Sequence, residues 1–156
     1  MEAEKSNTAK KYLNQAKRCD ALINNKKEEL EWLFGMATKV TGSFGGEIVS
    51  GSKSQDKIGD IMAKIIDLQR EINCDIDRLV DKRQEINTLI DSVPDYEEMR
   101  VLRLVYIGLW NKEEASTQYP TWKEIAHKLH TSERTVQRIH GRALQTIERI
   151  LKVDVV

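Results

Sequence analysis

The chain has 156 residues, and its 25 Lys and Arg are balanced by 25 Asp and Glu. At roughly 100–200 residues per domain, this length predicts one domain or two small ones. The 2 Pro and 8 Gly are too few for an all-β sandwich, which needs frequent turns. No apolar run approaches the ~18 residues of a membrane-spanning helix, and the N-terminus lacks the apolar core of a signal peptide. We therefore expect a cytoplasmic, mostly helical protein that contacts no membrane, with Cys19 and Cys74 as reduced thiols.

Residues 56–93 carry the most regular apolar pattern. Its members are spaced seven apart: Ile58, Ile65, Ile72, Leu79, Ile86 and Val93. A weaker series with the same spacing lies between residues 8 and 41: Ala9, Ala16, Ile23, Leu30 and Ala37. Heptad spacing is typical of helices that pack along one seam. We predict an all-α fold that begins with a long, coiled-coil-like antiparallel helical hairpin over residues 1–93, with a Gly-rich tip loop at 42–55.

The glycines of the tip loop suggest phosphate binding as an alternative function, but the residues around them argue against it. Gly46 and Gly51 have the spacing of a phosphate-binding loop, but Ser52 stands where that motif requires Lys, and no strand precedes it. We therefore expect a connecting loop whose further role stays open.

The apolar stripe of residues 58–93 is broad at both ends and exceeds what one partner helix covers. This excess predicts a homodimer formed through the N-terminal helices.

Residues 94–156 are predicted to form a second, C-terminal domain. Pro94 ends the long helical pattern, and a shorter helix with an acidic first turn follows it. Residues 111–119 show no periodicity and are expected to be a polar connector. From residue 121 the pattern becomes helical again. We expect no strand and no internal repeat in the chain.

Residues 121–151 predict two helices joined by a tight turn. Thr121 and Glu124 have the spacing of a capping box, which begins the first helix. The run ends at His130, and Ser132 is suited to cap a second helix over residues 132–150. Two helices joined by a turn of about three residues, with the small Ala126 at their crossing, indicate a helix-turn-helix motif. His130 occupies the turn position and must adopt a left-handed backbone.

The local charge favours nucleic acid as the partner of this motif. Residues 121–152 hold seven basic and three acidic side chains, a net charge of 7 − 3 = +4. A basic patch on a neutral protein is typical of a nucleic-acid-binding module. The second helix would enter the major groove, where Arg recognises guanine and Gln recognises adenine. The candidate DNA-binding residues are Lys123, Ser132, Glu133, Arg134, Thr135, Gln137, Arg138, Arg142 and Arg149, the last two as phosphate contacts.

The stretch from Pro94 to Leu151 resembles the DNA-binding region four of bacterial sigma factors. The similarity rests on the pattern EIA-K-L followed by S-E-R-T-V-x-R-I and R-A-L. Together with KYLNQAKRCDALINNKKEEL and VSGSKSQDKIGD, the whole chain is similar to small phage and prophage regulators near the ArpU and RinA type activators of late genes. The resemblance implies a transcriptional regulator in a bacterial host, with base contacts from Glu133, Arg134, Gln137 and Arg138 and RNA polymerase as a further partner.

Two alternatives stay open at this point. Small terminase subunits of phage DNA packaging also combine a helix-turn-helix with long helices, and they form rings. A helix-turn-helix can also bind protein, here RNA polymerase, in place of DNA. Catalysis is not expected, because no nucleophile and base are paired in the sequence. His127 and His130 lack the further ligands of a zinc site, so we expect neither a metal nor another cofactor.

Overall fold

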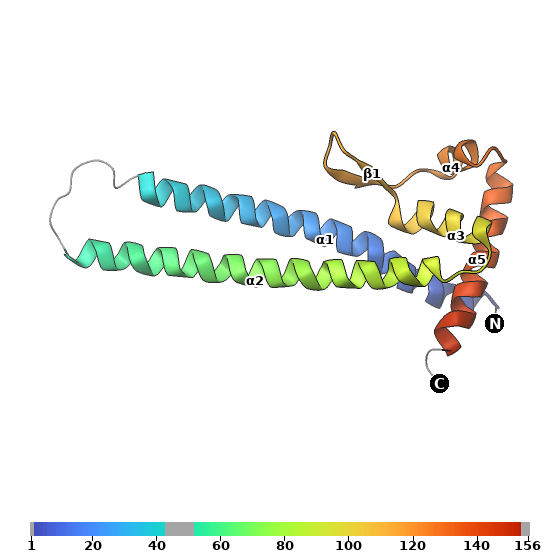
Figure 1. Cartoon of the computed structure of the whole chain (residues 1–156), viewed down its shortest axis with the longest axis horizontal. Coiled ribbons are helices and arrows are strands. Elements are labelled where there is room, and N and C mark those ends of the chain that lie inside the picture. Colours follow the sequence, from blue (N-terminus) through green and yellow to red (C-terminus); the bar gives the residue numbers. More distant parts are fainter. Residues whose placement is uncertain (1, 43–51, 154–156) are drawn as a thin grey trace. The chain divides into compact units, whose positions relative to one another are not determined.

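The computed structural model describes residues 2–42 and 52–153, and it is mostly helical (Figure 1). Its helices are α1 (Glu2–Gly42), α2 (Ser52–Asp91), α3 (Tyr96–Leu102), α4 (Trp122–Lys128) and α5 (Glu133–Val153). A π-helical turn (Arg103–Ile107) continues α3, and strands β1 (Leu109–Asn111) and β2 (Ser116–Gln118) follow it. Within the described ranges, no helix is long and apolar enough to cross a membrane.

The chain divides into two compact units, and each long helix contributes to both. The first unit comprises Met1–Asp20 and Asp81–Val156, and the second comprises Ala21–Val80. This division differs from the expected boundary at residue 93. The N-terminal end of α1 and the C-terminal end of α2 lie in the same unit as the C-terminal helices, because their apolar side chains share a core.

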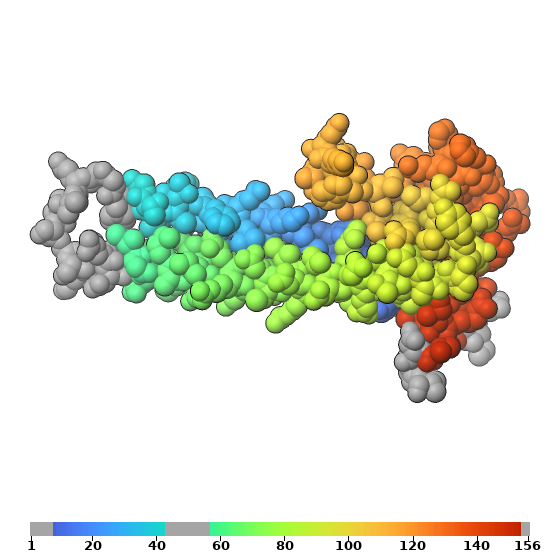
Figure 2. Space-filling view, in the orientation of Figure 1, coloured from blue at the N-terminus to red at the C-terminus, as the bar shows by residue number. Residues whose placement is uncertain are grey.

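In the unit Ala21–Val80, α1 and α2 run antiparallel. The Nζ of Lys26 lies 3.2 Å from Oδ2 of Asp75, and Leu33 packs with Ile65 and Ile72. Residues late in α1 thus meet residues early in α2, and the two segments touch along this unit (cyan and green in Figure 2). The start of α2 at Ser52 corrects the expected tip loop of 42–55, since residues 52–55 are helical. The rest of that loop, residues 43–51, lies outside the described residues.

The other unit has a core built from α1, α2, the end of α3, the π-helical turn and α5. Its members are Ala9, Leu13, Ala16, Ile86, Ile90, Val93, Leu102, Tyr106, Ile107, Ala143, Leu144 and Ile147. The small side chains of Ala9, Ala16 and Ala143 are fully buried, which allows close approach of helix backbones. Ala9 and Ala16 of the weak N-terminal series therefore contribute to the core that holds α5.

A two-stranded antiparallel sheet replaces the polar connector expected at residues 111–119. Leu109 pairs with Gln118 and Asn111 with Ser116, so the expectation of helices alone was wrong for this segment. Asn111 Oδ1 accepts a hydrogen bond of 2.9 Å from the backbone N–H of Glu113, which stabilises the turn between the strands. Strands of three residues are too short to show the alternating pattern by which a sequence reveals a strand.

Gly108 makes the sharp change of direction from the π-helical turn into β1. Its φ of 73° lies in the left-handed region. A Cβ at this position would stand 2.5 Å from the carbonyl oxygen of Gln118. Only glycine fits without moving β2.

Candidate nucleic-acid interface

Helix α4 begins as the sequence predicts. The Thr121 hydroxyl accepts a hydrogen bond from the Glu124 backbone N–H at 3.3 Å, and the Glu124 carboxylate accepts one from the Thr121 backbone N–H at 2.7 Å. This reciprocal capping box is therefore confirmed. The hydrogen bonds lower the pKa of Glu124, so the carboxylate keeps its charge at the positive end of the helix.

The turn after α4 depends on a left-handed residue. His130 has φ 52°, which confirms the expectation for this position. The backbone N–H of Thr131 donates to the carbonyl of Ala126 at 3.0 Å, and this bond closes the end of the helix. The geometry turns the chain sharply away from α4 within three residues.

Ser132 begins α5 by accepting a 3.2 Å hydrogen bond from the backbone N–H of Thr135. The expected recognition helix of 132–150 is thus shifted slightly, since Ser132 is the cap and the helix extends from Glu133 to Val153. Thr135 is half-buried, and its hydroxyl lies 2.9 Å from that of Ser132. Both hydroxyls are therefore engaged at the helix start.

One side of α5 is anchored in an apolar cluster. Val136 and Ile139 pack with Val101 of α3 and with Ile125 and Ala126 of α4. This contact holds the first turns of α5 against both neighbouring helices. The side chains on the opposite side of these turns have a fixed direction as a result.

The predicted residues at the start of α5 are brought together on that opposite side. Glu133, Arg134, Gln137 and Arg138 are all exposed, and residues three and four apart are neighbours on a helix. Among the described residues, Arg134 and Arg138 form no ion pair. Their guanidinium groups are available to an external ligand. Lys123 is also exposed, but on the first turn of α4.

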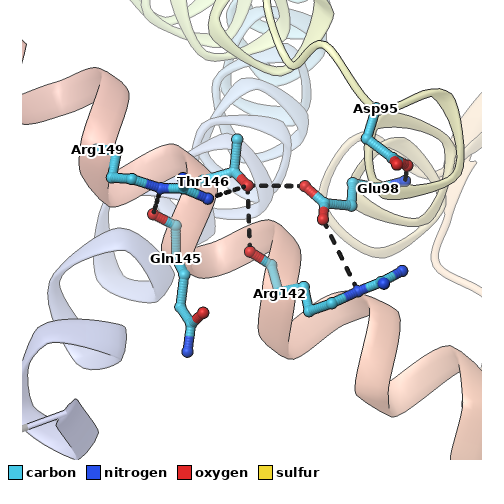
Figure 3. A network of polar contacts seen from close by, with 6 residues as sticks. All are labelled: Asp95, Glu98, Arg142, Gln145, Thr146 and Arg149. Atoms are coloured by element: carbon cyan, nitrogen blue, oxygen red, sulfur yellow. Dashed lines mark hydrogen bonds and ion pairs between the residues drawn. The ribbon is translucent and has the colours of Figure 1, made fainter.

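Arg142 and Arg149 belong to a polar network between α3 and α5 (Figure 3). Arg142 Nε lies 3.9 Å from Glu98 Oε1, and Arg149 Nη2 donates to Thr146 Oγ1 at 3.2 Å. Thr146 Oγ1 in turn donates to Glu98 Oε2 at 2.8 Å. At about 1.5 Å per residue, Arg149 stands roughly 22 Å along the helix from Arg134. Both arginines thus contact other residues of the chain, and Arg149 lies apart from the first turns of α5.

Glu98 is the residue of this network that sequence reasoning missed. It is only 8% exposed, whereas the sequence indicated no more than an acidic residue in the first turn of a helix. Its backbone N–H donates to Asp95 Oδ1 at 2.9 Å, which caps α3. A buried carboxylate needs polar partners, and these come from α5, more than forty residues later in the chain.

His140 lies inside the unit rather than on the exposed side of α5. Its ring stacks on Tyr106 and meets Trp122 edge-on. Burial, together with the charges of Lys10 and Lys17, lowers the pKa of His140 to about 4. The ring is therefore neutral at pH 7 and adds no charge to the basic segment.

A small groove lies beside the start of α5. Its volume is about 220 Å³, and Tyr96, Arg100, Thr131 and Thr135 line it, among others. Arg100 is exposed on α3 and was not a candidate from the sequence, because it precedes the two-helix segment by more than twenty residues. It adds a positive charge next to the predicted binding surface.

A larger groove of about 590 Å³ lies between the strands and α4, and His127 and Lys128 line it together with Leu109 and Tyr119.

Among the residues that the structure describes, no three His, Cys, Asp or Glu side chains are grouped to hold a metal ion. Cys19 is buried and Cys74 is exposed, and both are free thiols.

These features define a mostly helical protein whose last two helices present a polar and basic surface. The sequence matches the family described as "Protein of unknown function (DUF1492)" over residues 40–148. That range covers most of the chain, so the protein belongs to this family. No curated protein and no solved structure matches the sequence.

Proposed function

We propose that the protein is a sequence-specific DNA-binding regulator of transcription, with α4 and α5 acting as a helix-turn-helix. In this proposal α5 enters the major groove by its first turns, and α4 supports it. The resemblance to late-gene activators extends the proposal to control of phage or prophage late genes, with RNA polymerase as a partner. The two long helices would form a hairpin arm on this module.

The observation that carries the proposal is the two-sided character of the first turns of α5. Arg134, Gln137 and Arg138 are exposed, while Val136 and Ile139 on the other side are buried against α3 and α4. Arg and Gln are the side chains that form two hydrogen bonds with guanine and adenine in the major groove. A rigid helix that presents them at its N-terminal end has the geometry such recognition requires.

Charge supports the same proposal. Arg134, Arg138, Lys123 and Arg100 are exposed, and each can displace a counterion from a DNA phosphate. Each phosphate contact adds about 0.9 to the slope of log affinity against log salt. The neutral His140 does not contribute at pH 7.

The test is binding of the full chain to a pool of random duplex DNA, followed by selection of the bound sequences. We expect enrichment of one short motif and an affinity that falls steeply with salt. The matched control is the double variant Arg134→Ala with Arg138→Ala, which should lose the motif and keep the fold. Binding that is independent of salt, or a wild-type pool without enrichment, would contradict the proposal.

A further inference from the structure

The unit Ala21–Val80 leaves large apolar side chains exposed. In α1, Trp32 is 62% and Phe34 is 58% exposed. In α2, Ile61, Ile66 and Leu68 are each 44% exposed. The apolar side chains that are buried within the described part of this unit are few: Ile23, Leu33, Ile65 and Ile72. So small a core is marginal for a unit of this size, since small units bury too little surface to be stable alone.

The exposed side chains of α1 fall on two different sides of the helix pair. Leu33 is buried against α2 with Ile65 and Ile72. Successive helical residues turn by about 100°, so Trp32 and Phe34 point to opposite sides of the contact. Met36, three residues after Leu33 and 38% exposed, lies on the side of Trp32.

The exposed side chains of α2 divide in the same way. Ile61 and Leu68 each precede a buried isoleucine by four residues, which places both about 40° to one side of the contact. Ile66 follows the buried Ile65 directly and lies about 100° to the other side. Trp32, Ile61 and Leu68 are all rotated backward along their helices from a buried residue. In an antiparallel pair, this rotation leads to the same side of the pair in both helices, so Ile61 and Leu68 lie on the side of Trp32.

The ion pair between Lys26 and Asp75 sets the level of the two helices relative to each other. Counting six residues forward from Lys26 and seven back from Asp75 brings Trp32 level with Leu68. The side chains of Trp32, Met36, Ile61 and Leu68 therefore form one apolar surface, here named the Trp32 face. Phe34 and Ile66 lie on the opposite face.

We propose that the Trp32 face binds a second copy of this chain, so that two helix pairs form an antiparallel four-helix bundle. The second copy would add the layer that the small core of this unit lacks. Two-fold dimers bury the same patch on both subunits. The proposal concerns association only and does not depend on DNA binding.

The side of the helix pair that carries the Trp32 face is large enough for a dimer interface. The segment Ala21–Gly42 is about 33 Å long at 1.5 Å per residue, and two adjacent helices are about 20 Å wide, which gives roughly 650 Å². Stable interfaces of standard size bury about 600–1,000 Å² per partner. One face of this unit is therefore of the size that a stable homodimer requires.

Charge around the face also favours an identical partner. Glu28 precedes Trp32 by four residues, and Lys64 precedes Leu68 by four, so the two border the face as helix neighbours. They carry opposite charges and come from different helices. A border of mixed sign does not repel a copy of itself, whereas a strongly charged partner would gain nothing from it.

The test is the mass of the full chain by light scattering at micromolar concentration. We expect a value near 36 kDa, twice the 18.0 kDa of one chain. The double variant Trp32→Glu with Leu68→Glu should reduce the mass to that of one chain, because it buries four charges in a dimer. The matched control, Phe34→Glu with Ile66→Glu, adds the same charges at nearly the same exposure on the opposite face and should stay dimeric.

Substitution of Ile65 or Ile72 would not test the dimer, because both are buried between α1 and α2 and a charge there would disrupt the helix pair. If the Trp32→Glu with Leu68→Glu variant loses its helical circular dichroism, the milder variant Leu68→Gln replaces it. We expect Leu68→Gln to raise the dissociation constant of the dimer about tenfold or more. A wild-type monomer, a mass several-fold above 36 kDa, or equal dissociation of the control would overturn the proposal. So would a Leu68→Gln variant that dimerises normally. None of these results involves DNA, so they are independent of the proposed function.

Discussion

The Oη of Tyr106 lies 2.9 Å from Nε2 of His140, and the two rings stack with their centroids 5.7 Å apart. This contact joins the π-helical turn after α3 to the middle of α5. Burial raises the pKa of Tyr106 to about 12 and lowers that of His140 to about 4. Both groups are therefore neutral at pH 7, and the hydrogen bond between them is between uncharged partners.

Stability should fall as the pH is lowered from 6.5 to about 4. In this window the unfolded chain protonates His140, whereas the folded chain keeps the ring neutral. Protonation of His140 therefore lowers the free energy of unfolding by up to about 2 kcal/mol, a value reduced because the ring is partly exposed to solvent. Urea unfolding across this window should show the loss, and His140→Gln should flatten the pH dependence. An unchanged slope in that variant would show that other groups cause it.

Arg134→Ala and Arg138→Ala should each weaken binding at the selected DNA site by ~1–3 kcal/mol if the guanidinium contacts a base pair through two hydrogen bonds. Arg149→Ala is the control on the same helix, since Arg149 is engaged with Thr146 and stands well away from the first turns of α5. We expect it to change affinity little and equally on specific and random duplexes. Fluorescence anisotropy with both duplexes measures the difference. If all three variants lose the same affinity on both duplexes, none of these arginines recognises sequence.

A fragment of residues 94–156 should fail to fold cooperatively. The core around α5 is completed by Leu13 of α1 and by Ile86 and Ile90 of α2, all fully buried. In the full chain, Leu13→Ala alone should cost ~2–5 kcal/mol of unfolding free energy through the cavity it leaves. Leu22→Ala, at a position 37% exposed, is the control and should cost much less. A fragment with a sharp thermal transition would show that residues 94–156 are an independent domain after all.

Two glycines should respond oppositely to alanine. Gly108→Ala forces a Cβ to within 2.5 Å of the Gln118 carbonyl at a positive φ and should destabilise by ~2 kcal/mol or more. Gly141→Ala meets no atom within 4 Å in the middle of α5 and should stabilise by ~0.5–1 kcal/mol through helix propensity. Chemical denaturation of the two variants tests both signs. If Gly141→Ala also weakens DNA binding, the glycine serves close approach to the DNA backbone.

The aspartate of α1 shows how far apart in sequence the decisive contacts lie. Asp20 accepts hydrogen bonds from Arg83 Nε at 2.5 Å and from the Tyr119 hydroxyl, and Arg83 Nη2 also donates to the Ile107 carbonyl at 3.1 Å. These bonds tie α1, α2 and the segments on either side of the strand pair together. No periodicity or motif connects these positions, so their pairing could not be predicted from the sequence.

Local signals in the sequence predicted the helices and the caps of α4 and α5. The heptad spacing placed Ile65, Ile72 and Ile86 at buried positions, since helical periodicity follows from the backbone alone. The caps at Thr121 and Ser132 were predictable for the same reason, because a cap bonds to an N–H three residues away.

Only the tertiary structure decided which surfaces meet. It buried Glu98 against α5, made His140 neutral, paired β1 with β2, and joined the N-terminal end of α1 and the C-terminal end of α2 to the C-terminal core. Each of these features depends on groups that are distant in the chain. The spacing of residues in the sequence does not reveal which distant residue a side chain contacts. The sequence alone therefore identified the exposed residues of α5 as candidates. The distance of Arg149 from these residues follows from its place on the same helix, whereas the engagement of Arg142 with Glu98 depends on how α3 and α5 pack.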